Sequence, residues 1–200
     1  MKVDHQRNGS DRLGAPTVPG RACGPCTLCC KLLTVEAIRK PANKWCSNCA
    51  IGRGCLVYDT RPEECRDFYC GFMTLHQLGE EWRPSTSKLM LGIETGGNTV
   101  FVHVDPGRPN AWKSEPFYSK LKEWAGNAVP SHGHVIVHIA RQRIVVLPDR
   151  DVDLGAIGED EMVVVGEQRL PTGVVLSPFT MKRDDPRAER VKKGGPPIPL

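Results

Sequence analysis

This 200-residue chain has a hydrophobic content of 40% and a charged content of 25%, the balance of a globular protein. Its formal net charge of +4 is modest: it permits weak attraction to nucleic acid or acidic lipid but does not argue for either, so nucleic acid is not an expected partner. Residues 1–20 lack the apolar core of a signal peptide, and no stretch approaches the ~18 apolar residues of a membrane helix. We therefore expect a cytoplasmic protein with no membrane partner.

The composition divides the chain into four parts. Residues 1–21 are polar and predict a flexible N-terminal arm. Residues 22–85 hold all nine cysteines and predict a cysteine-cluster metal-binding module. Residues 86–180 predict an α+β part without cysteine, and residues 181–200 predict a disordered basic tail rich in proline and glycine.

The cysteine module begins with Cys23-Gly-Pro-Cys26-Thr-Leu-Cys29-Cys30, and a further CxxC pair follows at Cys46 and Cys49. In a reducing compartment such density favours a thiolate metal site over disulfides. Two spacings fit a four-cysteine zinc site, because the Cys46/Cys49 pair can join either Cys26/Cys29 or Cys23/Cys26. The start also matches the first three ligands of a bacterial ferredoxin, but the fourth element, Cys-Pro, is missing. Zinc is therefore favoured over iron or an iron–sulfur cluster.

A short helix is predicted near the end of the module. Thr60-Arg61-Pro62-Glu63 has the pattern of a capping box, so we expect a helix with Thr60 as its N-cap that runs to about Tyr69 or Cys70, with Gly71 as the C-terminal cap. Cys65 and Cys70 would lie on different faces of a regular helix, so they can share a metal only if Cys70 lies beyond the last turn. Arg61 and Arg66 are candidates to offset thiolate charge.

The pattern of residues 23–85 resembles the CxxCxxCC zinc- or iron-chelating domain family, also called YkgJ-type cysteine cluster proteins. The resemblance rests on the CxxCxxCC start, Gly54-Cys55-Leu-Val-Tyr58, Arg61-Pro62-Glu-Glu-Cys65-Arg66-Asp-Phe68-Tyr-Cys70 and Trp82-Arg83-Pro84. It implies metal binding without a settled reaction. The ligands it implies are Cys23, Cys26, Cys29, Cys30, Cys46, Cys55, Cys65 and Cys70. Cys49 departs from the family pattern, which makes it an extra ligand or a free thiol.

The second part of the chain predicts an antiparallel sheet with one helix on a face. Strands are expected at 89–93 and 99–104, with a Gly96-Gly97 turn, and at 135–140, 144–147 and 162–165. Ser114 is the expected cap of a helix that runs to about Ala125 and stops at Gly126. The predicted fold class is therefore α+β, with the small cysteine module packed on the sheet.

Histidines form a second candidate ligand set. On a strand, His134, Ile136 and His138 share one face, and His103 on the other hairpin is a candidate to join them. No carboxylate lies at ligand spacing, so a polar sheet face is the simpler interpretation.

The predicted function is thiolate chelation of zinc or iron. Two alternatives stand beside it: an iron–sulfur redox or modifying enzyme, and a zinc-ribbon-like module that binds a protein or RNA. The expected partner is the metal ion, with a protein partner open. Whether the protein is an enzyme is left undecided by the sequence.

Overall fold

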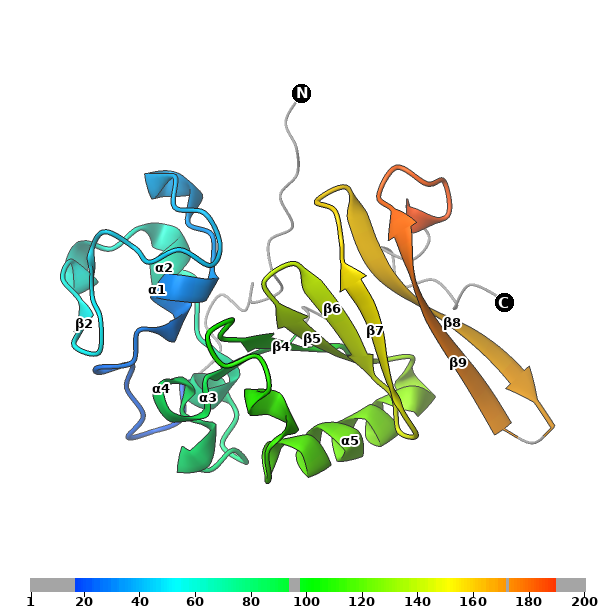
Figure 1. Cartoon of the computed structure of the whole chain (residues 1–200). Helices are drawn as coiled ribbons and strands as arrows, with labels where there is room; N and C mark the ends of the chain where they lie inside the picture. Colours follow the sequence, from blue (N-terminus) through cyan, green and yellow to red (C-terminus); the bar gives the residue numbers. More distant parts are fainter. Residues whose placement is uncertain (1–16, 94–97, 172, 190–200) are drawn as a thin grey trace.

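A five-stranded sheet forms the centre of the computed structural model, which describes residues 17–93, 98–171 and 173–189 (Figure 1). Its strands, in spatial order, are β3 Leu89–Ile93, β4 Val100–Val104, β5 Val135–Ile139, β6 Gln142–Val146 and β7 Asp151–Ala156. The predicted strands of both hairpins are confirmed, although β6 begins two residues earlier than expected. The predicted Gly96-Gly97 turn lies outside the described residues.

The sheet is mixed, not purely antiparallel as expected. β4 and β5 run parallel, with Val102 opposite Val137, and every other neighbouring pair is antiparallel. The physical reason is the connection, because a helix between two adjacent strands carries the chain back to the edge from which it started. That helix is α5 Phe117–Ala128, preceded by the 3₁₀ turn η4 Ala111–Lys113.

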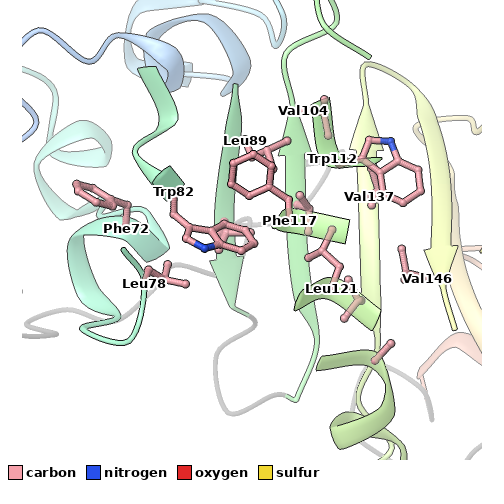
Figure 2. Close-up of a cluster of buried hydrophobic side chains, with 14 of the residues drawn as sticks. Phe72, Leu78, Trp82, Leu89, Val104, Trp112, Phe117, Leu121, Val137 and Val146 are labelled. Carbon is pink, nitrogen blue, oxygen red and sulfur yellow. The ribbon is translucent and has the colours of Figure 1, made fainter. Parts of the chain in front are cut away.

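One face of the sheet packs against α5 and builds the main core. Leu121 of the helix is fully buried against valines of β4 and β5. Trp82 closes the core from the cysteine module, with its ring centroid 4.8 Å from that of Phe117 and 5.2 Å from that of Trp124. Figure 2 shows Trp82 beside Phe117 and Leu121, between the helix and β3.

The helix does not end where the sequence predicted. α5 continues through Gly126 to Ala128, and the turn η5 Val129–Ser131 extends it to His132, whose φ of 55° ends the segment. A glycine inside a helix costs only about 1 kcal/mol, which packing of the neighbouring Ala125 offsets. Ser114 also does not cap the helix, because its hydroxyl donates to the carbonyl of Ala111.

A long two-stranded ribbon follows the sheet. β8 Glu161–Leu170 and β9 Gly173–Lys182 pair along their whole length and project from the molecule in Figure 1. The sequence predicted only 162–165 as a strand here, and it missed β7 and β9. The predicted tail begins at 181, whereas β9 runs through Lys182 and Ala188 is fully buried; residues 190–200 lie outside the described residues.

The cysteine module is made of short elements joined by turns. The strands β1 Cys49–Ala50 and β2 Gly54–Cys55 form a small hairpin. The helices are α1 Leu28–Leu32, α2 Glu63–Asp67, α3 Gly71–Thr74 and α4 Pro84–Ser87, and the 3₁₀ turns are η1 Glu36–Ile38, η2 Tyr58–Thr60 and η3 Glu80–Trp82. Arg21, at the end of the predicted arm, donates to the carbonyls of Phe72, Leu75 and Leu78, so this part of the arm is held to the module.

The module covers both faces of the edge strand β3. Phe72 of α3 joins Leu89 and Leu91 in the main core, while Leu28 and Leu32 of α1 pack with Met90 on the opposite face. Since β3 alternates its side chains, both contacts are made by one strand. The α+β fold class is confirmed, and the module shares its core with the sheet.

α2 is shorter than the predicted helix. It runs from Glu63 to Asp67, with Pro62 at the N-cap position and no side-chain cap. The residue before a proline favours extended backbone, and Arg61 has φ −60° and ψ 152°, so Thr60 cannot start the helix. The chain becomes extended at Phe68, which places Cys70 beyond the helix, immediately before α3.

Gly71 allows the close contact between α3 and β3. A Cβ at this position would lie 2.8 Å from the Cβ of Leu91, closer than two carbons can approach. We expect Gly71→Ala to lower the free energy of unfolding by about 1–3 kcal/mol, as overpacked cores do. Gly126→Ala is the matched control, because nothing lies within 4 Å of its Cβ and alanine favours helix. Urea unfolding of both variants tests this, and equal stability of the two would contradict the steric explanation.

Candidate metal centre

The first CxxC turn brings two thiols together. The amide of Cys26 donates to the carbonyl of Cys23 at 2.9 Å, and Gly24 supplies a φ of 49° inside the turn. Positive φ is accessible to glycine at little cost, which explains its place there. α1 starts two residues later, and burial of Leu28 and Leu32 against β3 fixes the helix that carries Cys29 and Cys30.

A second CxxC turn is tied to α1 by its backbone. The amide of Cys46 donates to the carbonyl of Cys30 at 3.0 Å, and the amide of Cys49 donates to the carbonyl of Cys46 at 3.1 Å. Cys49 then pairs with Cys55 across the β1–β2 hairpin. The backbone alone therefore gathers cysteines from three separate segments around α1.

The thiols fall into two groups, judged by which of them interact. The first group contains Cys23, Cys26 and Cys70. Burial raises the pKa of Cys70 to about 11, against backbone hydrogen bonds that lower it, and Cys23 and Cys26 add to the rise. Burial also raises the pKa of Cys23, with Cys26 as the next cause.

The second group contains Cys29, Cys30, Cys46, Cys49, Cys55 and Cys65. The pKa of Cys30 is raised, first by a hydrogen bond with the Cys29 thiol and then by burial. Burial raises the pKa of Cys49 to about 11, and its thiol is hydrogen-bonded with that of Cys30. Burial likewise raises the pKa of Cys65 to about 11, with Cys30, Cys46 and Cys55 contributing. Like charges held close together disfavour ionisation, which is why the neighbouring thiols add to the rise in the pKa of Cys65.

The two cysteines of the block around α2 belong to different groups. Cys65 lies inside α2 and faces the second group, whereas Cys70 follows the helix and faces the first. Cys49, expected to be an extra ligand or a free thiol, is not isolated but lies against Cys30. A weaker interaction between Cys23 and Cys30 links the two groups.

Lys40 provides positive charge beside the second group. Its side chain is only 5% exposed, and its ammonium donates to the carbonyls of Lys31, Leu33 and Pro41. Burial lowers the pKa of this ammonium, while the thiols of Cys46, Cys30, Cys29 and Cys65 oppose the change. A buried cation facing four thiols stabilises whatever negative charge they carry.

Two arginines face the first group. The Arg61 guanidinium lies 3.9 Å over the Tyr58 ring and interacts with Cys23, and its Nε is buried without a hydrogen-bond partner. Arg83 interacts with Cys26 and Cys70 and is ion-paired with Glu80 at 2.8 Å. Among the described residues Arg66 has no such contact with a thiol, so of the two predicted arginines only Arg61 lies where expected.

Among the residues that the structure describes, all nine cysteines are free thiols, and no three His, Cys, Asp or Glu side chains stand together as a ready metal site. Metal binding would therefore require the thiols of each group to close up. Lys40 was missed by the sequence analysis, because a lysine between Arg39 and Pro41 carries no signal of burial.

The histidines divide differently. His103 and His138 lie opposite each other on β4 and β5, with ring centroids 4.8 Å apart, so the predicted approach of His103 is confirmed. His132 lies apart from this pair and contacts Glu167, with 2.6 Å between Nδ1 of His132 and Oε2 of Glu167. In the described part of the chain these rings do not assemble with a third metal-ligating group.

Acid should destabilise the protein through this histidine pair. Burial lowers the pKa of His103 from 6.5 to about 4, and burial together with His103 lowers that of His138. As the pH falls, the histidines of the unfolded chain are protonated before those of the folded protein. The contribution of the neutral histidine pair to the free energy of unfolding is therefore complete above pH 6.5 and falls as the pH decreases toward 4. Urea unfolding against pH should give a shallower decline for His103→Gln than for the unmodified protein. The exposed His76→Gln is the control, and parallel curves for all three would contradict the assignment.

Comparison of the chain with models of known families, with curated proteins and with solved structures finds no match. In the part of the chain that the structure describes, no helix has both the length and the apolar character needed to cross a membrane.

Proposed function

We propose that this protein is a metal-binding cysteine cluster protein that chelates zinc or iron through thiolates. The observation that carries the proposal is the approach of thiols from four segments of the chain to α1, where a buried cation meets them. Interacting thiols and a compensating cation are the elements of a thiolate metal site. The family resemblance of residues 23–85 supports the same function.

The donor set fits a soft divalent metal. The nine thiols, soft donors that outnumber the one carboxylate acting on them among the described residues, that of Glu64 beside Cys65, favour zinc or iron over magnesium or calcium. The second group has more thiols than the four that one tetrahedral ion takes, and the first has three. We therefore propose two metal positions, with the ligands Cys23, Cys26, Cys29, Cys30, Cys46, Cys55, Cys65 and Cys70.

The environment of the first group supports this fit. The Nε–H of Arg61 is buried without an acceptor, and its neighbour Cys23 would become one on losing its proton. A bound metal ion would supply the positive charge that keeps Cys23, Cys26 and Cys70 ionised. Arg61 and Arg83 would then hold the orientation of these thiolates and offset their excess charge. Such sites need reduced thiols, so we place the protein in a reducing compartment, the cytosol.

Anaerobic purification from cells supplied with zinc and iron, followed by elemental analysis and a visible spectrum, tests the proposal. About two equivalents of zinc without colour would support closed thiolate sites. Iron with acid-labile sulfide and visible absorption would support the iron–sulfur alternative. Alkylation of the purified protein should spare the cysteines that bind metal until a chelator is added. Metal-free protein in which all nine cysteines react at once would contradict the proposal.

A further inference from the structure

The sheet face opposite α5 carries a row of side chains that metal binding does not explain. Residues in register across β3, β4, β5 and β6 are Met90, His103, His138 and Arg143. Their neighbours along each strand, such as Val102 and Val137, belong to the core under α5. Since side chains alternate along a strand, the row lies on the other face.

Other elements cover this face on both sides of the row. α1 of the cysteine module packs on Met90 at one end. The ribbon packs through Val165 and Leu176 on Val145 of β6 and on Leu147, which follows β6 directly. His103, His138 and Arg143 are half-buried between these covered parts.

Several polar atoms of this row have no hydrogen-bond partner among the described residues. In the described part of the chain neither ring nitrogen of His103 or His138 has a hydrogen-bond partner, and the two rings contact each other and Phe101. Arg143 donates from Nη1 to the carbonyls of Ala140 and Gln142, both at 2.9 Å. Its Nε and Nη2 have no partner among the described residues, which leaves two N–H edges for a ligand.

Two cations lie near Arg143. They are Arg183 and Arg141, and burial together with these two cations lowers the pKa of Arg143 to about 10. Two neutral imidazoles beside a guanidinium would hold a cation poorly but an oxyanion well, because the guanidinium fork matches carboxylate and phosphate oxygens.

The sheet is irregular beside Arg143. The register between β6 and β7 shifts between Gln142 and Ile144, so Arg143 has no register partner on β7, where Leu154 and Gly155 lie opposite it. Bulges of this kind are frequent next to binding sites. Toward β5 the pairing is regular, with Arg143 opposite His138.

We propose that His103, His138 and Arg143 form a binding site for a small oxyanion, the phosphate or carboxylate group of a small molecule. Arg143 provides the charge, and the two imidazoles donate or accept hydrogen bonds according to the protonation of the ligand. The site does not depend on the metal centre, and its position beside α1 places any bound molecule next to the cysteine module.

Titration of the full-length protein with inorganic phosphate, with acetate and with chloride at matched ionic strength tests the site. The readout is the NMR signals of imidazole-labelled histidines. We expect saturable shifts of His103 and His138 with phosphate, acetate or both, with a Kd of about 1 mM, and no saturation with chloride. Whichever oxyanion saturates identifies the ligand class. No saturation by either oxyanion, or equal effects of chloride, would overturn the proposal.

Variants distinguish specific oxyanion binding at these side chains from a general effect of ionic strength. Arg143→Gln should weaken oxyanion binding about 10- to 100-fold, the range expected on losing hydrogen bonds from a charged group. His138→Gln should weaken it less, and exposed His76→Gln should leave it unchanged. Circular dichroism of each variant establishes folding before titration. Unchanged binding by folded Arg143→Gln would overturn the proposal, as would saturation of the histidines by Ni²⁺ but by neither oxyanion.

Discussion

Replacement of Lys40 by methionine is expected to lower the free energy of unfolding by about 3 kcal/mol, because it leaves three backbone carbonyls without a donor at about 1 kcal/mol each. The same change should weaken metal binding about 10- to 100-fold, the effect typical of losing a group that supports the ligands. Its cause would be removal of the buried cation that faces Cys46, Cys30 and Cys29. Urea unfolding and competition with a chromophoric chelator measure the two effects separately.

Two further variants distinguish charge from packing at this position. Lys40→Arg retains the positive charge and should recover part of the metal affinity even if the larger head group costs stability. Lys44→Met removes a lysine from an exposed position of the same segment and should alter neither quantity. Equal metal affinity of Lys40→Met and Lys44→Met would show that the buried ammonium acts on the fold alone.

The strands of the central sheet could be predicted because their local pattern is strong. Val100–Val104 and Val135–Ile139 are β-branched runs with side chains suited to buried strands. The parallel pairing of these strands could not be derived from the same pattern, because it depends on where α5 returns the chain. β9 includes Pro178 and Ser177, which weaken a strand pattern, so its pairing with β8 comes from contacts across the ribbon.

The candidate site was predictable to the extent that sequence spacing determines it. The CxxC turns at Cys23 and Cys46 form as their spacing suggests, since each is a local turn closed by one backbone hydrogen bond. The division into two groups was not predictable, because it depends on where α2 ends. In a helix extended to Cys70, that thiol would have different neighbouring thiols. Pro62 sets the start of α2 and the extended backbone at Phe68 sets its end, so these two residues determine which group Cys70 joins.

This division predicts that Cys65→Ser and Cys70→Ser lose different metal ions. Cys65 interacts with the second group of thiols and Cys70 with the first, although only four residues separate them in sequence. We expect each single variant to lose about one equivalent of metal out of two, and the double variant to lose both, because a site without one of few ligands binds far more weakly. Elemental analysis of the three variants after identical anaerobic purification measures this directly.

The matched control is Cys49→Ser, which removes the one thiol of the second group that is not among the proposed ligands. Because Cys49 is not one of the proposed ligands, metal content should stay near that of the unmodified protein. Loss of a full equivalent would instead make Cys49 a ligand and restore the Cys46/Cys49 pair as a zinc knuckle. Loss of both equivalents from either Cys65→Ser or Cys70→Ser would contradict the division itself, because the nine thiols would then form one coupled cluster, joined where Cys23 meets Cys30.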